Sequence, residues 1–438
     1  MVRGDDHSNW EQVLMYLPAD YRELAEEHKQ LQAQWGNAKV VEADQLLRLI
    51  FLHAGANLPL RQTVAWVAQS GGPKLSAMRL HMKMRRAVPY LHALVQRMMQ
   101  PSMAARPELW GGYDLLAIDA TAVCGPGATG TDARLHTALR LSDLSLVHVE
   151  VTDVTGGETL KRFPLGADQL AIVDRGYSTA AGIAAGVGRG ADVLVRVNRG
   201  ALPLFDRDGV GVNVLVRLRT LVSHRAQEWP VSIHPERGTS MPGRLVAIRL
   251  PEREAAEARA RVVREEGADA SPELLEAAGY VALFTSVPAE RLSAARCVET
   301  YRLRWQVELL FKRWKSICGF DQLPNYRDDT IRAWLYAKVL LGVILDHMGT
   351  SLVDVFPAAP IPRAPEARSP SPRPLAANPW KLTTILWPVL LSAIIPMGLV
   401  DTLAALPEIA ERLHQETSAH RPRQLEAYRD HYVPVENC

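Results

Sequence analysis

Four polar residues late in the chain recur at intervals that place them on one side of an α-helix. Tyr301, Arg304, Glu308 and Lys315 lie within about 60° of one another on a helix of 100° per residue. Most apolar residues of the run 301–318 fall on the opposite side, where they would face a core. A carboxylate displayed between two cations can bind a divalent metal while the cations bind phosphate. The sequence therefore predicts one helix over 301–318 with a reactive polar face.

Two aspartates add further carboxylates. Asp119 follows the apolar run 115–118, and Asp174 follows the apolar run 170–173. Such runs are typical of buried strands, and catalytic groups collect at the ends of strands in α/β sheets. Together with Glu308, the two aspartates could hold two Mg²⁺ or Mn²⁺ ions about 3.5–4 Å apart. The sequence has no cluster of Cys and His residues that would favour zinc.

Each of these acids also has a purely structural explanation. Asp119 could be a turn residue after its strand, and Asp174 could cap the helix that follows. Glu308 could be a solvated partner of Arg304 and Lys312, which are both four residues away on the predicted helix. The three acids therefore indicate a metal site only when they are considered together.

The N-terminal region carries a basic stretch that contains no acid. Between Asp44 and Glu108 there is no Asp or Glu, whereas there are nine Lys and Arg residues. A field of that sign favours a polyanion such as nucleic acid. The runs 43–54, 60–69 and 75–99 have helical periodicity, and their order is compatible with a helix-turn-helix element. Packed helices with a basic outer face would look similar. The candidate DNA contacts in this stretch are Arg79, Lys83 and Arg86.

The elements that must position these residues divide the chain into six predicted segments. Strands are expected at 115–118, 139–151, 170–173 and 193–197 of an α/β core, and at 210–222, 229–234, 244–250 and 280–285 of an insertion. Helices are expected at 179–186, 251–266 and 331–347. The predicted segments are a helical, basic DNA-binding domain (1–107), the core (108–198 and 291–350), a β-rich insertion (199–290), a Pro-rich loop (351–380) and a helical C-terminal region (381–438).

Composition limits the class of protein. The chain has 438 residues, of which 47% are apolar and 22% charged, and this is typical of two or three globular domains. Its four cysteines are scattered, which favours a reduced intracellular compartment, and the N-terminus has no apolar signal stretch. The run 382–400 is about long enough to span a membrane, but Pro388 and Pro396 interrupt it. We expect it to form a buried helix pair or hairpin, without a membrane partner.

The polar stripe carries a family resemblance. Tyr301, Arg304, Glu308 and Lys315 match every gap of the Y-(2)-R-(3)-E-(6)-K pattern for which one group of enzymes is named. The flanking run RWQVELLFKRWKS is also similar to that group. On these residues the chain resembles the DDE transposases of insertion sequence family four.

The remaining motifs extend the resemblance over about residues 40–350. Asp119 in AIDAT matches the first catalytic aspartate, and Asp174 in IVDRGY matches the second. His136 and Gly157-Glu158 look like the sequence that the family has between them. The two aspartates and the four-residue pattern occur in the expected order.

The resemblance implies a fold and a reaction. The fold would be an RNase H-like catalytic core, a mixed sheet with helices, interrupted by a β-rich insertion. The reaction would be cut-and-paste transposition by metal-dependent strand cleavage and strand transfer at terminal inverted repeats. The implied partners are double-stranded DNA, both the element ends and the target, and a second copy of the chain in a synaptic complex. The implied location is the bacterial cytoplasm, at the nucleoid.

The resemblance also implies a role for each residue. Asp119, Asp174 and Glu308 would be the catalytic metal ligands, for Mg²⁺ or Mn²⁺ and for two ions. The DNA phosphate contacts near the cleavage site would be Tyr301, Arg304 and Lys315, joined by Lys312 on the same helix. Some members stack a tryptophan of the insertion on a flipped base, and here Trp229 is the tryptophan in that region. Ordinary strand packing would explain Trp229 equally simply.

The sequence leaves two other functions open. A metal-dependent nuclease of the same fold would cut DNA without joining strands. A catalytically silent DNA-binding relative, or a membrane-associated protein that uses 382–400, would need no metal site. The presence of all three acids argues against lost catalysis, and the single interrupted apolar run argues against the membrane.

Overall fold

We describe the protein from a computed structural model that covers residues 9–28, 42–70, 72–99, 112–125, 130, 132–267, 270–324, 329–355 and 379–395. Its internal contacts divide the chain into two compact units. The helical unit comprises Met1–Met98, Cys124–Ala128 and Arg313–Cys438, and the α/β unit comprises Met99–Val123 and Thr129–Lys312. Most of the predicted Pro-rich loop, from 356 to 378, lies outside the described residues, as does the chain after 395.

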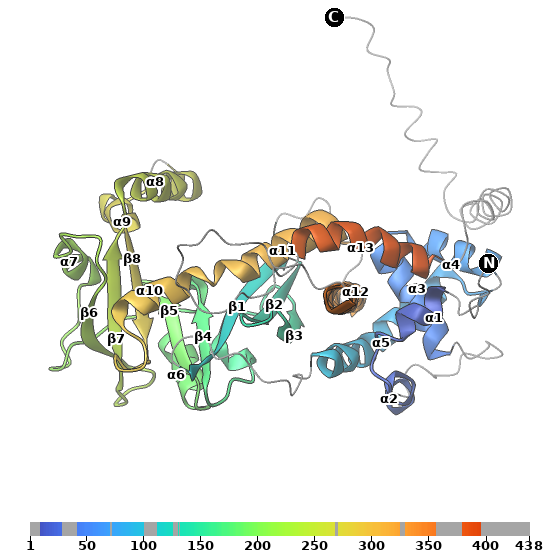
Figure 1. Ribbon diagram of the computed structural model, residues 1–438, viewed down its shortest axis with the longest axis horizontal. Coiled ribbons are helices and arrows are strands. Elements are labelled where there is room, and N and C mark those ends of the chain that lie inside the picture. Colours follow the sequence, from blue (N-terminus) through green and yellow to red (C-terminus); the bar gives the residue numbers. More distant parts are fainter. Residues whose placement is uncertain are drawn as a thin grey trace, which may run out of the picture. The chain divides into compact units, whose positions relative to one another are not determined.

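The α/β unit is built on one sheet, which among the described residues has eight strands in the order β3-β2-β1-β4-β5-β8-β7-β6 (Figure 1). β1 pairs in parallel with β4, and β4 in parallel with β5, whereas the other neighbours are antiparallel. The sheet is therefore mixed. The strands are β1 (Asp114–Val123), β2 (Ala133–Arg140), β3 (Leu146–Thr152), β4 (Gln169–Val173), β5 (Asp192–Arg196), β6 (Gln227–Ile233), β7 (Met241–Arg249) and β8 (Tyr280–Thr285).

Alternating side chains of the central strands form two separate cores. Leu115 of β1 and Leu170 of β4 belong to the cluster that packs against α10 (Ala294–Arg302). Their neighbours Leu116 and Ala171 belong to the cluster on the opposite face, with α6 (Ala180–Val187) and α7 (Val214–Arg219). Such burial on both faces explains why these strands read as continuous apolar runs in the sequence.

The helical unit surrounds one long helix. α12 (Asp329–Val355) contacts α3, α5 and α13, and α4 packs against α3 and α5. Arg48 of α3 donates a hydrogen bond to the carbonyl of Ile394 at 3.0 Å and so ties α3 to the end of α13. No helix of the described residues is long and apolar enough to cross a membrane. The other helices here are α1 (Asn9–Leu14), α2 (Tyr21–Glu27), α3 (Ala43–Gly55), α4 (Leu60–Gln69), α5 (Ala77–Met98) and α13 (Pro379–Ile394).

The expected strand at 210–222 was wrong. This run contains instead the helix α7, and the side chain of Asn213, the residue before the helix, accepts a hydrogen bond from the Val216 backbone N–H. The apolar residues 214, 215, 218 and 221 are spaced for a helix, so helical periodicity should have been preferred there. Of the run 382–400, the residues up to Ile394 belong to the helix α13, with Pro388 inside it, and residues 396–400 lie outside the described residues.

The predicted continuous helix at 301–318 is also wrong. α10 ends at Arg302, and α11 (Trp305–Cys318) begins after a tighter turn. In this turn the backbone N–H of Leu303 donates to the carbonyl of Thr300, and that of Arg304 to the carbonyl of Tyr301. Hydrogen bonds of this i to i−3 type wind the chain more tightly than an α-helix. Tyr301 and Glu308 therefore lie on different helices, with Arg304 at the junction.

Candidate active site

Three polar residues form a row across the centre of the sheet. The pairing register of β1, β4 and β5 sets the positions of Asp119, Asp174 and Arg196 side by side. Because side chains alternate between the two faces of a sheet, these three residues lie on the same face as the residues that pack against α10. Asp174 follows the end of its strand as predicted, whereas Asp119 lies within β1, which continues to Val123. The row thus places two carboxylates and one guanidinium on one face of the sheet.

Arg304 joins an acid of the sheet to an acid of the helix. Its Nη1 lies 3.3 Å from Asp119 Oδ2, and its Nη2 donates to Glu308 Oε1. The side chains of Arg304, Asp119 and Glu308 are 14%, 15% and 27% exposed, so the network is largely screened from solvent. The pairing of Glu308 with Arg304 is therefore present, but the pair is largely screened from solvent and is connected to Asp119.

The electrostatic environment disfavours a negative charge on Asp119. Burial raises the pKa of Asp119 to about 7, and the neighbouring charges of Asp174 and Glu308 add to this effect. Arg304 opposes it, as does the Ala120 backbone N–H, which donates to Asp119 Oδ1 at 2.8 Å. Desolvated carboxylates that repel one another in this way are stabilised by a nearby cation.

This raised pKa predicts a pH-dependent stability. Because the native state holds the Asp119 proton up to about pH 7 and the unfolded state only to about pH 4, stability falls as pH rises through this window. In chelator, Asp119→Asn should therefore raise the thermal midpoint at pH 8 by about 2–4 °C per kcal/mol of relieved repulsion. At pH 4 the variant and the parent protein should unfold together in a calorimeter. An equal difference at both pH values would contradict the burial of this charge.

The other predicted residues of the 301–318 run have different surroundings. Tyr301 lies half-buried on α10, where burial raises its pKa while Arg304 and Arg196 act to lower it. Lys312 is exposed, and its Nζ lies 4.3 Å from the ring centre of Trp305. Lys315 lies in the part of α11 that is grouped with the helical unit.

The predicted DNA contacts of the N-terminal stretch all lie on α5. Arg79 is exposed, and burial lowers the pKa of Lys83, with a further contribution from Arg86. Other basic residues of the stretch serve the fold: Arg97 pairs with Asp20 at 2.6 Å, and Arg48 binds the end of α13. Some basic residues of this acid-free stretch therefore stabilise the fold, and others remain exposed on its surface.

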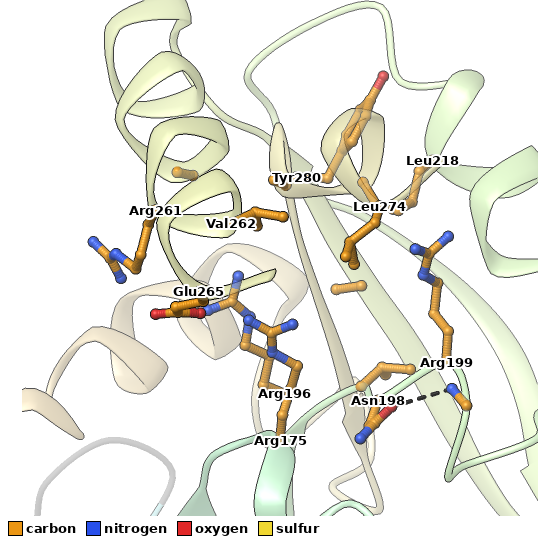
Figure 2. A pocket seen from close by; sticks show the side chains of 16 residues that line it. Arg175, Arg196, Asn198, Arg199, Leu218, Arg261, Val262, Glu265, Leu274 and Tyr280 are labelled. Carbon is orange, nitrogen blue, oxygen red and sulfur yellow. Dashed lines mark hydrogen bonds between the residues drawn. The ribbon is translucent and has the colours of Figure 1, made fainter. Parts of the chain in front are cut away.

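Sequence reasoning missed a basic pocket that shares Arg196 with the row. The pocket has a volume of about 190 Å³ and lies between β5, β8, α8 (Glu252–Glu266) and α9 (Pro272–Ala278). Figure 2 shows the side chains of Arg175 and Arg196 rising together toward α8, with Arg199 on the other side. Arg261 and the partly buried ring of Tyr280 also line it.

The pocket is strongly cationic for its size. Burial lowers the pKa of Arg196, and the neighbouring guanidinium groups of Arg175 and Arg261 contribute in the same direction. Of the lining residues in the described part of the chain, Glu265 is the single acid. An uncompensated, half-buried guanidinium favours an anionic ligand. The only sign of this pocket in the sequence was Arg196, which ends an apolar strand and lies on the same face of the sheet as Asp174.

Trp229 does not line this pocket. It lies on β6 and packs, partly buried, against the core cluster that includes Val231 and Leu245. The strand-packing explanation is the one that the contacts support, and Tyr280 is the aromatic residue at the pocket.

The donor chemistry of the site fits a hard divalent cation. Asp119, Asp174 and Glu308 offer carboxylate oxygens, which Mg²⁺ and Mn²⁺ prefer. Arg304 already bridges Asp119 and Glu308, as a cation between carboxylates would. Nowhere in the described ranges do three Asp, Glu, His or Cys side chains stand close enough to ligate one ion as they are. The side chains would therefore have to adjust to hold a metal.

The known proteins that this chain is similar to are transposases. A family model described as the transposase DDE domain matches residues 110–343, which include all three acids. The transposase of insertion sequence element IS421 from Escherichia coli is 30% identical over 363 residues, which are 80% of this chain and 96% of that protein. InsL of element IS186A from Escherichia coli strain K12 is 30% identical over 362 residues, with the same coverage of both chains. The transposase of element IS231F from Bacillus thuringiensis subsp. israelensis is 35% identical over 63 residues, 14% of this chain and 13% of that protein. The chain belongs to the DDE transposases of insertion sequences.

Proposed function

We propose that the protein catalyses cut-and-paste transposition of an insertion sequence, by strand cleavage and strand transfer at terminal inverted repeats. The observation that carries this proposal is the network in which Arg304 joins Asp119 of the sheet to Glu308 of α11, beside Asp174. The strand order 3-2-1-4-5 of the core, with β1, β4 and β5 parallel, supports an RNase H-like catalytic domain. β6, β7 and β8 then represent the insertion.

Asp119, Asp174 and Glu308 are the proposed ligands of two Mg²⁺ or Mn²⁺ ions. When bound, such ions activate the attacking oxygen and stabilise the leaving oxygen. The protein contributes one carboxylate on β1, one directly after the adjacent strand β4, and a third on α11. Because Asp119 retains its proton up to about pH 7, its carboxylate must release that proton to accept a cation near neutral pH.

DNA phosphate is the proposed ligand of the surrounding cations. Tyr301, Arg304 and Arg196 lie next to the acids, where a backbone phosphate would give Arg304 an alternative partner to Glu308. The basic pocket would receive a phosphate-bearing nucleotide of the same strand, with its base against apolar lining such as Leu218 and Tyr280. Lys312 and Lys315 would extend these contacts along α11.

The remaining domains are proposed to handle the rest of the DNA. Arg79, Lys83 and Arg86 of α5 would contact duplex DNA, as part of a DNA-binding domain at 1–107. Two copies of the chain would hold the two element ends in a synaptic complex before the target DNA is joined.

The test is a reaction on DNA that carries the element's ends. The full chain with Mg²⁺ should cut at the end of the element and then join the freed 3′ end to a second duplex. Cleavage without joining would instead identify a nuclease, and binding without either step would identify a catalytically silent relative. Scrambled end sequences provide the control for specificity.

The basic pocket makes a separate prediction about DNA affinity. The double substitution Arg199→Ala and Arg261→Ala should weaken binding of end DNA and reduce the slope of log affinity against log salt by about 1 for each phosphate that the variant no longer binds. Arg253→Ala is the matched control, because Arg253 lies on α8 as well, is 91% exposed and pairs with Glu257. Fluorescence anisotropy over a salt series measures both quantities. Equal slopes for the double variant and the control would remove the pocket from the DNA path.

A further inference from the structure

Glu158 is an additional acid next to the proposed site, on the segment between β3 and β4. We propose that Glu158 is a fourth carboxylate of the catalytic site and helps to hold a divalent cation, Mg²⁺ or Mn²⁺, on the Asp174 side. This inference rests on the proposed metal-dependent function. It adds a residue that lies outside both the sheet row and the α10–α11 junction.

The Glu158 carboxylate lies directly against Gly176. A Cβ atom built on Gly176 would lie 1.7 Å from Glu158 Oε2, so in this conformation the oxygen occupies the space that a side chain at position 176 would take. The backbone N–H of the same glycine donates to Asp174 Oδ1 at 2.8 Å. Gly176 thus holds the Asp174 carboxylate through its N–H and admits Glu158 through its missing side chain. The glycine of the Asp-Arg-Gly-Tyr turn therefore contacts both carboxylates.

The charge of Glu158 is unfavourable where it lies. Burial raises the pKa of Glu158, the charge of Asp174 adds to the effect, and Arg134 opposes it. Among the described residues Arg134 forms no salt bridge with Glu158, and its Nη1 donates at 2.9 Å to the carbonyl of Gly156. In the described part of the chain the Glu158 carboxylate has no hydrogen bond or salt bridge of its own. A half-buried carboxylate beside a second one, with no direct cationic partner, is an arrangement that a divalent cation would stabilise.

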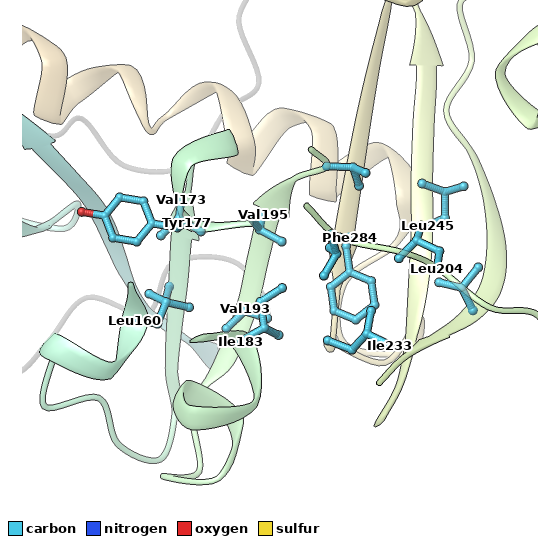
Figure 3. Packing of buried hydrophobic residues seen from close by; sticks show 14 of the residues in the cluster. Leu160, Val173, Tyr177, Ile183, Val193, Val195, Leu204, Ile233, Leu245 and Phe284 are labelled. Atoms are coloured by element: carbon cyan, nitrogen blue, oxygen red, sulfur yellow. The ribbon is translucent and has the colours of Figure 1, made fainter. Parts of the chain in front are cut away.

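Tyr177 is an unpartnered buried polar group beside the same acids. Its side chain is fully buried, yet its hydroxyl has no hydrogen-bond partner among the described residues. In Figure 3 the ring packs on the hydrophobic cluster, and the hydroxyl points away from it. Burial raises the pKa of this hydroxyl, the charges of Asp119, Glu158 and Asp174 add to the effect, and Arg134 opposes it. A buried O–H without an acceptor costs stability, so a small shift of one carboxylate or a bound water is expected to satisfy it.

These contacts connect Glu158 to the site from two directions. Gly176 brings its oxygen to the turn that holds Asp174, and the Tyr177 hydroxyl lies within the field of the same acids. A purely structural acid would instead be paired, as Glu150 is with Arg162 at 2.8 Å. The geometry therefore gives Glu158 a role in holding the cation rather than in holding the fold.

The test measures Mn²⁺ binding to the full chain without DNA, by electron paramagnetic resonance of the free ion. Glu158→Gln should weaken Mn²⁺ binding roughly 10- to 100-fold, the range seen when groups that support metal ligands are removed. Glu158→Asp, which retains the charge on a shorter side chain, should give an intermediate affinity. Glu254→Gln is the control, because it removes an exposed carboxylate from the first turn of α8 and should leave the affinity unchanged.

Thermal unfolding of the same variants in chelator separates the two roles of Glu158. If Glu158 binds a cation, Glu158→Gln retains or raises the unfolding midpoint, since it removes a repelled charge. A lowered midpoint with unchanged Mn²⁺ affinity would overturn the proposal and make Glu158 structural. Asp174→Asn tests the underlying site: if it weakens Mn²⁺ binding and Glu158→Gln does not, only the present inference fails. If neither variant changes the affinity, the proposed metal site itself is wrong.

Discussion

Glu308→Gln is expected to reduce strand cleavage and strand transfer together by roughly a thousandfold or more, about 4 kcal/mol of transition-state stabilisation. The substitution retains the size of the side chain and its ability to accept a hydrogen bond from Arg304 Nη2. It removes the charge that a divalent cation requires. Gel assays of nicking and joining on end DNA measure the two steps separately.

The affinity for DNA should be almost unchanged in the Glu308 variant, because Glu308 is not a cation and contacts no phosphate in the proposed complex. Glu299→Gln is the matched control: Glu299 lies on the neighbouring helix α10, pairs with Arg296 at 2.8 Å and is about half exposed. The control variant should cut and join normally. Full activity of Glu308→Gln would exclude Glu308 from the metal site, and loss of joining alone would show that cleavage uses other ligands.

Arg304→Gln is expected to have the second-largest effect. It removes the cation that joins Asp119 to Glu308 and, in the proposed complex, a phosphate contact. Cleavage should fall about 100-fold, and the salt slope of end binding should fall by about 1. Arg304→Lys should not restore activity, because an ammonium cannot reach two carboxylates in the forked geometry that a guanidinium uses.

Arg302→Gln is the control for the Arg304 variants, since Arg302 is an exposed arginine at the end of α10, two residues before Arg304. It should change neither cleavage nor the salt slope by a comparable amount. Wild-type cleavage in Arg304→Lys would show that the bridge between the two acids is unimportant, even if DNA binding is reduced.

The elements that could be predicted from sequence were those with a clear local pattern. The strand at 280–285 and the helix at 60–69 have the predicted bounds, because apolar runs and helical periodicity fix them without help from distant residues. The break between α10 and α11 could not be predicted in this way. Arg304 fits the helical period of the run, and only the tertiary contacts to Asp119 show why the chain turns there.

The candidate site was predictable only in part for a similar reason. Asp119, Asp174 and Glu308 stand out because each is an isolated acid beside an apolar element. Arg196 becomes visible only when β5 is known to be the neighbour of β4, since strand order is not a local property. The place of Glu158 near the site is visible only from its contact with Gly176, and the strand β4 separates these two residues in the sequence. Non-local contacts of this kind leave no periodic trace in a single sequence.

The way in which the insertion joins the core has a consequence for attempts to isolate the catalytic domain. β8 pairs with β5, so the strands of 199–290 continue the hydrogen-bonded ladder of the core instead of forming a separate module. Excision of this segment would leave β5 as an unpaired edge with exposed backbone N–H and C=O groups, next to apolar side chains such as Val195. A shortened enzyme would therefore tend to self-associate through that edge, and its design would need a protective charge or proline on β5.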